Sequence, residues 1–300
     1  MTFLRRSGVI ATAAATLLAW QAVGHSAWAG PAGGAAKRPP NPLCDRAAFR
    51  VAVDVGHTAQ SPGAMSARGV GEYDFNLRLA RRIEQDLLHA GFGRTVLLVT
   101  DGPTRRGLAE RVARANALSP DLFLSIHHDS VPDSFLQRWQ YEGEEHYFSD
   151  RFKGHSIFIS NDNADVAGSL LFGQLMGEQL RARDLQYTAH YIEKFMGHRQ
   201  RLLVDARTGV YRYDQLIVLK STQMPAVLLE AGSIINRDEE LLMSSPERQS
   251  AISAAVTDAV ESFCAVRKPR QPDRARAATV AKPALSPATS AQSAAAVKPR

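Results

Sequence analysis

Three short apolar segments, far apart in the chain, each lead into a side chain that can bind a metal ion or move a proton. Residues 50–55 lead into Gly56 and His57, residues 122–126 into His127, and residues 226–229 into Glu230. Short aliphatic runs bounded by turn residues are typical of buried strands in a parallel sheet. In open α/β sheets, ligands bind beyond the carboxyl ends of the strands. The sequence therefore predicts that two imidazoles and a carboxylate meet at one edge of a sheet.

Strand-like and helix-like segments alternate along the chain, which indicates βαβ units. The apolar runs predict strands over 50–55, 95–99, 122–126, 157–159, 216–219 and 226–229. Amphipathic periodicity predicts helices over 72–90, 108–118, 169–183 and 246–264. The expected fold class is α/β, with a single open, twisted, mostly parallel sheet flanked by helices on both faces. Residues 131–154 are acidic and rich in aromatic residues, and no structure is assigned to them. Residues 184–212 show no clear period and are predicted to be a long surface segment.

Both ends of the chain differ in composition from the middle, which predicts four regions. Residues 1–29 combine Arg5 and Arg6, an apolar stretch and Ala27-Trp28-Ala29, the pattern of a signal peptide with its cleavage site. A membrane anchor is the alternative, but the apolar run is short for one. Residues 30–45 are a Gly/Pro-rich linker, 46–266 the catalytic domain, and 267–300 a disordered, basic Ala/Pro-rich tail. We expect an exported protein of the periplasm or cell envelope, without stable membrane insertion.

The positive charge of the chain is concentrated in the tail. Residues 267–300 hold eight basic residues and one acid, a surplus of +7 against +6 for the whole chain. The remainder of the chain, residues 1–266, therefore carries a net charge of about −1, which argues against nucleic acid as a partner of the fold. Cys44 and Cys264, the two cysteines, flank the predicted domain. In an exported protein they could form a disulfide that joins its ends, or they could remain two free thiols.

The residues at the predicted sheet edge suit a zinc ion. A catalytic zinc typically takes three protein ligands and keeps one position for water. His57 and His127 supply two imidazoles, and Glu72, at the start of the helix predicted over 72–90, is the best-placed third ligand. The alternative for Glu72 is a first-turn glutamate that the helix dipole favours. We expect one Zn²⁺.

Glu230 ends an otherwise apolar strand, so its carboxylate needs either a partner or a function. Beside a zinc ion it can accept a proton from water and pass it to a leaving amine, and we assign it as the catalytic residue. A fourth metal ligand is the alternative. Asp54, within the first strand, could orient a ligand from behind. His128 should face away from His127, and no role is assigned to His89, His146, His155, His190 or His198.

Four blocks of sequence, in order, carry a resemblance to a known family. They are Val53-Asp54-Val55-Gly56-His57, then Gly69 to Asn76, then Leu108, Arg111, Ala115 and Asn116 followed by Asp121 to His127, and last Met224 to Gly232 with Asn236. Over residues 50–264 the chain resembles zinc-dependent N-acetylmuramoyl-L-alanine amidases of the AmiC, amidase_3-like type. The resemblance implies that His57, Glu72 and His127 hold zinc and that Glu230 is the catalytic glutamate. It also implies hydrolysis of the amide between N-acetylmuramic acid and L-alanine in peptidoglycan, in cell-wall lysis, remodelling or daughter-cell separation.

The resemblance leaves specificity and regulation open. His128-Asp129 departs from the family pattern, and residues 131–154 are longer than expected. Some relatives are silenced by a glutamate that takes the open metal position, and Glu142, Glu144 or Glu145 could act in this way. A protein activator in the envelope is a further expected partner besides peptidoglycan. The competing hypotheses are a zinc peptidase or deacylase acting on another amide, and a catalytically inactive envelope-binding module.

Overall fold

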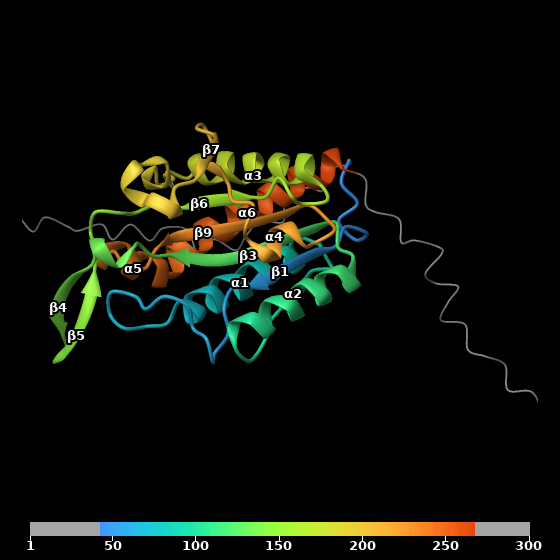
Figure 1. The fold of residues 1–300 in the computed structure, drawn as a ribbon. Helices are drawn as coiled ribbons and strands as arrows, with labels where there is room; N and C mark the ends of the chain where they lie inside the picture. The colour runs from blue at the N-terminus through green and yellow to red at the C-terminus, as the bar shows by residue number, and fades with distance from the viewer. Residues whose placement is uncertain (1–42, 268–300) are drawn as a thin grey trace, which may run out of the picture. The chain divides into compact units, whose positions relative to one another are not determined.

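A seven-stranded open sheet forms the centre of the computed structural model, which describes residues 43–267 (Figure 1). Its strand order is β2-β1-β3-β9-β6-β8-β7. The pairs β1–β2, β1–β3, β3–β9 and β6–β8 are parallel, whereas β6–β9 and β7–β8 are antiparallel. The strands are β1 (Val51–Val55), β2 (Val96–Leu98), β3 (Leu122–Asp129), β6 (Ser156–Ile159), β7 (Leu202–Asp205), β8 (Val210–Arg212) and β9 (Ala226–Ser233). The predicted open and mostly parallel sheet is confirmed.

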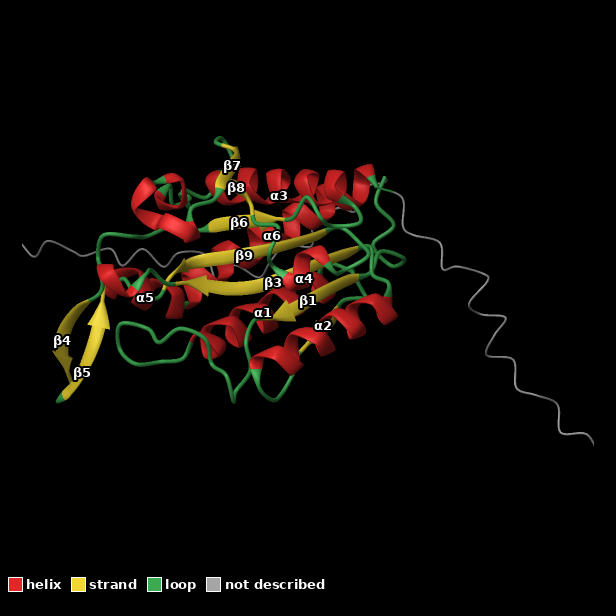
Figure 2. Cartoon of the chain, in the orientation of Figure 1, coloured by secondary structure: helices red, strands yellow, loops and turns green. Residues whose placement is uncertain are grey.

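Helices cover both faces of the sheet, as predicted (Figure 2). On one face the buried core joins the sheet to α1 (Glu72–His89), α3 (Val166–Arg181) and α6 (Pro246–Val266). On the other it joins the sheet to α2 (Thr104–Leu118) and α4 (Ile217–Lys220). This double cover explains why all five residues of β1 are buried and why the strands read as continuous apolar runs.

Helix α1 shows how the sequence pattern produces the packing. Phe75, Leu79, Ile83 and Leu87 recur every four residues and are at most 2% exposed. Burying side chains of this kind contributes roughly 1.5–3 kcal/mol each. The helix ends at His89, and Gly91 follows with a φ of 99°, a backbone conformation that favours glycine. This packing fixes the start of α1 against the sheet.

Three segments differ from their predicted structure. Residues 216–219 were predicted as a strand, but residues 217–219 lie in the short helix α4 and Leu216 is its N-cap, because a four-residue apolar run is too short to show a helical or strand period. Residues 131–154 contain the 3₁₀ helix η1 (Asp133–Phe135) and a hairpin of β4 (Gln137–Tyr141) and β5 (Glu144–Phe148). Residues 184–212 hold η2 (His190–Ile192), η3 (Lys194–Arg199), β7 and β8, so part of this segment extends the sheet. Helix α5 (Arg237–Ser244) was not predicted.

Cys44 and Cys264 form a disulfide, which decides between the two alternatives left open by the sequence. The bridge joins the segment before β1 to the end of α6 across 220 positions. From loop-closure entropy, a bridge of this span stabilises the folded state by at most about 5 kcal/mol. An ion pair of 2.6 Å between Arg46 Nε and Glu261 Oε2 lies beside it. The two ends of the described domain are therefore linked covalently.

Several predicted regions lie outside the described residues: the signal peptide (1–29), most of the linker (30–45) and the tail beyond residue 267. Among residues 43–267, no helix has both the length and the apolar character needed to cross a bilayer.

Candidate active site

The three predicted strand ends lie side by side, because β1, β3 and β9 are neighbours in the sheet. His57 follows the end of β1 by two residues, and His127 lies near the end of β3. Glu230 on β9 is the direct partner of His127 in the β3–β9 ladder. Parallel neighbours are about 4.8 Å apart, so the two side chains start close to one another. The fold thus brings residues separated by more than 170 positions of sequence to one edge.

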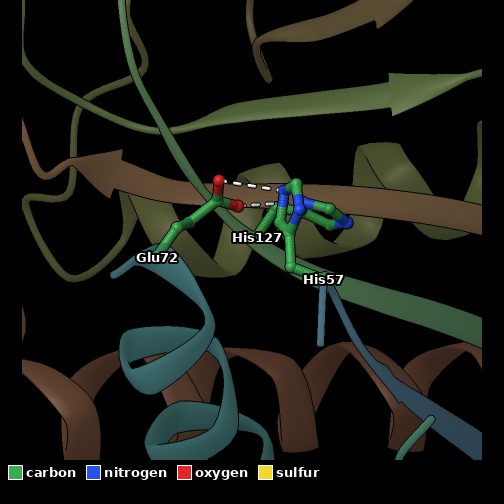
Figure 3. Close-up of side chains that lie close together, drawn as sticks. All are labelled: His57, Glu72 and His127. Atoms are coloured by element: carbon green, nitrogen blue, oxygen red, sulfur yellow. Dashed lines mark hydrogen bonds and ion pairs between the residues drawn. The ribbon is translucent and has the colours of Figure 1, made fainter. Parts of the chain in front are cut away.

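His57, Glu72 and His127 converge on one point (Figure 3). Each carboxylate oxygen of Glu72 faces one imidazole: Oε1 lies 2.9 Å from His127 Nδ1, and Oε2 lies 3.0 Å from His57 Nε2. One donor atom from each residue lies within 4.8 Å of the other two. Two imidazoles and one carboxylate are a common ligand set of catalytic zinc, so the residues present fit that ion. The three form a candidate metal site.

Burial and the two imidazoles act in opposite directions on Glu72. Burial of this side chain, which is 5% exposed, raises its pKa. Hydrogen bonds from His127 and His57, together with their charge, outweigh this effect and lower the pKa well below its usual value. Glu72 is therefore an anion that can balance the charge of a cation held there.

The loop before Glu72 is closely fitted to the side chains of the candidate metal site. His57 itself has a φ of 64°, which is unusual for a residue with a side chain. Gly63 has a φ of 80°, and a Cβ atom there would lie 2.5 Å from Glu72 Oε2 and 2.7 Å from His57 Cδ2. At the end of the loop, the Glu72 amide donates to the Ala64 carbonyl at 2.8 Å, and the Ala64 amide donates to Glu72 Oε2 at 3.2 Å. The loop and its glutamate hold each other in place.

A buried arginine supports His57 from behind. Arg111, on α2, is 3% exposed and donates to the His57 carbonyl. Its Nε donates to Thr100 Oγ1 at 2.9 Å and lies 3.4 Å from Asp54 Oδ1. Ser125 Oγ donates to the other oxygen of Asp54 at 2.7 Å. Asp54 is therefore linked to the His57 backbone through Arg111.

Asn76 supports the other side of the site. It lies one turn after Glu72 on α1, and its amide nitrogen donates to Glu72 Oε1 at 3.1 Å and to the Gly56 carbonyl at 3.2 Å. Its amide oxygen lies 2.8 Å from His128 Nδ1. Burial lowers the pKa of His128 to about 3. His128 is thus a neutral residue that fixes Asn76 and is not part of the three-residue cluster.

Glu230 lies beside the cluster and is not a member of it. Its Oε2 atom is buried and has no hydrogen-bond partner among residues 43–267. Burial, followed by the charges of Asp129 and Glu72, raises the pKa of Glu230 well above its usual value. A divalent cation nearby acts in the opposite direction, because it favours the anion. Such a carboxylate can hold a proton and release it, as general acid–base chemistry requires.

Asp129 is a second buried carboxylate at this edge. It is 4% exposed and accepts a hydrogen bond of 2.7 Å from the Tyr191 hydroxyl. Burial raises its pKa to about 6, although Tyr191 and Arg199 act against this shift. Asp129 and Glu230 both line a cavity of about 700 Å³. On the side of Glu230 and Asp129, the candidate active site therefore adjoins a space large enough for part of a substrate.

The other candidates of the sequence analysis lie elsewhere. Glu142, Glu144 and Glu145 are exposed on the β4–β5 hairpin, and none belongs to the cluster. His198 lines the cavity beside Glu230, although no role was assigned to it. Asn236 caps α5, since its side-chain oxygen accepts from the amides of Asp238 and Glu239.

Sequence reasoning missed the supporting roles of Asn76, Arg111 and Asp129. Asn76 had a usable signal, because it follows Glu72 by four positions and so shares its helix face. Arg111 shares a face with Leu108 and Ala115, where a charged residue is unexpected, but its contacts depend on the tertiary structure. Asp129 lies beyond the predicted strand of residues 122–126, because β3 extends three residues further than predicted.

Comparison with known proteins gives one family and several relatives. The family model Amidase_3, described as N-acetylmuramoyl-L-alanine amidase, matches residues 51–262. The chain is 24% identical to the N-acetylmuramoyl-L-alanine amidase AmiA of Escherichia coli over 225 residues, which cover 71% of this chain and 75% of AmiA.

Solved amidase structures resemble the fold. The amidase Ami1 of Mycobacterium smegmatis superposes with a TM-score of 0.57 at 22% identity, over 74% of this chain and 99% of Ami1. The CwlD amidase of Clostridioides difficile, solved in complex with the GerS lipoprotein, superposes with a TM-score of 0.53 at 19% identity, over 73% of this chain and all of CwlD.

Proposed function

Because the chain belongs to the Amidase_3 family of N-acetylmuramoyl-L-alanine amidases, we propose that it cuts peptidoglycan with one zinc ion held by His57, Glu72 and His127. The enzyme class and the peptidoglycan substrate follow from the family. The metal and the residue roles are our proposal. The observation that carries them is the convergence of two imidazoles and a carboxylate at a strand edge next to Glu230.

The surrounding residues hold the three proposed ligands in position for a zinc ion. Zinc supplies Lewis acidity, which lowers the pKa of water and stabilises negative charge on a carbonyl oxygen. His57 is held by the Arg111 contact to its carbonyl, and Glu72 by Asn76 and the Ala64 amide. These contacts orient the donor atoms before any ion binds, which supports the metal role.

Glu230 is the proposed general base and then general acid. Its carboxylate takes a proton from the water that attacks the carbonyl carbon between the lactyl group and L-alanine. When the carbon–nitrogen bond breaks, Glu230 passes that proton to the departing amine, so the carboxylate is restored. The partner-free Oε2 atom and the adjoining cavity support this assignment over a fourth metal ligand.

The remaining proposals concern organisation and place of action. We propose one catalytic domain over 46–266, preceded by a signal peptide (1–29) and a linker (30–45) and followed by a basic tail (267–300). The enzyme would then act in the periplasm or cell envelope, where peptidoglycan lies. A disulfide between Cys44 and Cys264 suits an oxidising compartment and supports export. A protein activator is proposed by analogy with the complex of CwlD and GerS.

The test replaces Glu230 by Gln and measures zinc content and peptidoglycan cleavage together. We expect about one zinc per chain in both proteins and a loss of at least about 100-fold in rate for Glu230→Gln, in line with the typical size of general acid–base catalysis. Mass spectrometry of the wild-type digest should show stems that begin with L-alanine. Cleavage within the stem would favour a zinc peptidase, and absence of cleavage would favour an inactive binding module. Loss of zinc in Glu230→Gln would make this residue a ligand.

A further inference from the structure

The cavity beside Glu230 has a basic wall formed by residues of the segment that sequence reasoning could not assign. The cavity measures about 700 Å³, and Glu230 and Asp129 line it. Three arginines of the η3–β7 and β8 regions also line it: Arg199, Arg201 and Arg212. A substrate whose scissile bond lies at Glu230 can therefore reach these guanidinium groups through the same cavity. This inference rests on the proposed function.

The three arginines differ in whether their charge is already neutralised. Arg212 pairs with Asp214, since its Nε lies 2.6 Å from Asp214 Oδ2. Arg199 donates to the Ser130 carbonyl at 3.0 Å, and its nearest carboxylate, Asp129, lies 3.9 Å away. The charge of Arg212 is thus neutralised by a close carboxylate, whereas the contact of Arg199 with a carboxylate is long.

Arg201 is the best candidate of the three to bind an anion, because its guanidinium is held in place without a carboxylate. Its Cζ lies 3.6 Å from the centre of the Tyr213 ring, and its Nη1 donates to the carbonyls of His198 and Gln200 at 2.8 Å. These contacts fix the plane of the guanidinium without using a carboxylate. Its Nε is buried and has no hydrogen-bond partner in the part of the chain that the structure describes. A buried donor without a partner costs free energy, which a ligand's acceptor can recover.

The chemistry of the substrate supplies such an acceptor. The stem peptide begins at the amide that is cut, and its second residue carries a carboxyl group that is either free or amidated. Arginine presents a planar fork of donors that matches a carboxylate and gains less from a neutral amide. We propose that Arg201, supported by Arg199, binds the free carboxylate of the stem, so that the enzyme prefers acidic stems over amidated ones.

The test uses two synthetic muropeptides with full stems that differ only in this carboxyl group, and the zinc-loaded full-length chain. The wild-type enzyme should cleave the acidic muropeptide about 10- to 100-fold more efficiently, the range of a hydrogen bond between charged groups. Arg201→Gln should lose this preference, mainly through a higher KM, and should change the amidated muropeptide by less than about threefold. Arg201→Lys should retain part of the preference, because it keeps the charge without the fork.

Arg207→Gln is the matched control, because Arg207 pairs with Glu178 on the exposed surface and does not line this cavity. It should keep the wild-type preference. An equal loss on both muropeptides in Arg201→Gln, or a wild-type enzyme without preference, would overturn the subsite and leave the amidase proposal standing. A wild-type enzyme that cleaves neither muropeptide would overturn the proposed function, and the subsite with it. Thermal midpoints measured for each variant separate binding defects from unfolding.

Discussion

At the scale of single residues, the candidate metal site depends on two backbone positions with positive φ angles. His57 has a φ of 64°, and Gly63, in the following loop, has a φ of 80°. Positive φ angles cost a residue with a side chain roughly 1 kcal/mol or more, and glycine very little. At Gly63 the space is restricted as well, because Glu72 Oε2 and His57 Cδ2 occupy the place of a Cβ atom. The loop is therefore fitted closely to Glu72 and His57, two of the proposed ligands.

Replacing Gly63 by Ala should weaken zinc binding by about 10- to 100-fold, the usual effect of disturbing groups around metal ligands. The added methyl group displaces Glu72 or His57, so the activity should fall in parallel at low zinc concentration. Titration with a competing chelator measures the affinity. Gly143→Ala is the control, since Gly143 has a φ of 87° but no atom near its Cβ position. Equal zinc affinity in the two variants would show that the methyl group added at Gly63 does not disturb zinc binding.

The sequence predicts the residues at the site better than the contacts that hold them. His57, His127 and Glu230 are recognisable because each follows or ends a buried apolar run, and strand ends in a parallel sheet share an edge. The support that Arg111 gives to the His57 carbonyl joins α2 to the loop after β1. No local pattern contains that pairing, because it forms only when the two elements pack together.

At the scale of elements, the β4–β5 hairpin holds the loop that leads to Glu72. Trp139 Nε1 donates to the Ala67 carbonyl at 2.8 Å, and the Arg68 guanidinium lies 5.4 Å from the Trp139 and Tyr141 ring centres. Arg68 also pairs with Glu240 on α5 at 2.6 Å. The hairpin thus contacts the loop through its aromatic side chains, while its glutamates are exposed. This arrangement favours a supporting role over an inhibitory one.

Trp139→Ala should therefore lower activity by several-fold and increase amide hydrogen exchange in residues 58–71, because the loop loses a hydrogen bond and a cation–π contact. Tyr147→Ala is the control on the same hairpin, as this side chain is 43% exposed and no hydrogen bond from it to the loop is present in the described part of the chain. Hydrogen exchange and peptidoglycan cleavage are measured on the same preparations. An increase in activity on loss of Trp139 would instead support inhibition by the hairpin.

The sequence predicts best those elements whose apolar pattern extends over several turns or a whole strand. Helix α1 begins at Glu72 as expected and ends within one residue of the predicted limit, because its apolar stripe spans several turns. Residues 216–219 were wrongly predicted as a strand, whereas Leu216 caps α4 and residues 217–219 lie in this helix. There the helix is favoured by tertiary contacts, including the amide of Asn163, which donates to the Leu219 carbonyl at 2.6 Å. Short segments follow their surroundings more than their own propensity.

At the scale of the whole molecule, buried histidines make stability depend on pH. Burial lowers the pKa of His155 to about 4, and the charge of Arg248 acts in the same direction, against the Gln186 carbonyl. An unfolded histidine titrates near 6.5. As pH falls from 6.5 to 4, His155 binds a proton in the unfolded chain but stays neutral in the folded chain. The free energy of unfolding therefore decreases. Asp129, with a pKa raised to about 6, acts in the opposite direction between its unfolded pKa of about 3.8 and 6.

His155→Gln should therefore flatten the decline of stability between pH 7.5 and pH 5 by on the order of 2 kcal/mol, the linkage expected from the lowered pKa. Urea unfolding at both pH values, with chelator present so that metal release does not contribute, measures the difference. His89→Gln is the control, because it removes only an exposed imidazole on α1. Since Asp129 is present in all three proteins, its opposing contribution cancels in the comparison. If His155→Gln and wild type lose the same stability on acidification, then His155 becomes protonated without cost in the folded state, and the acid sensitivity of the fold arises elsewhere.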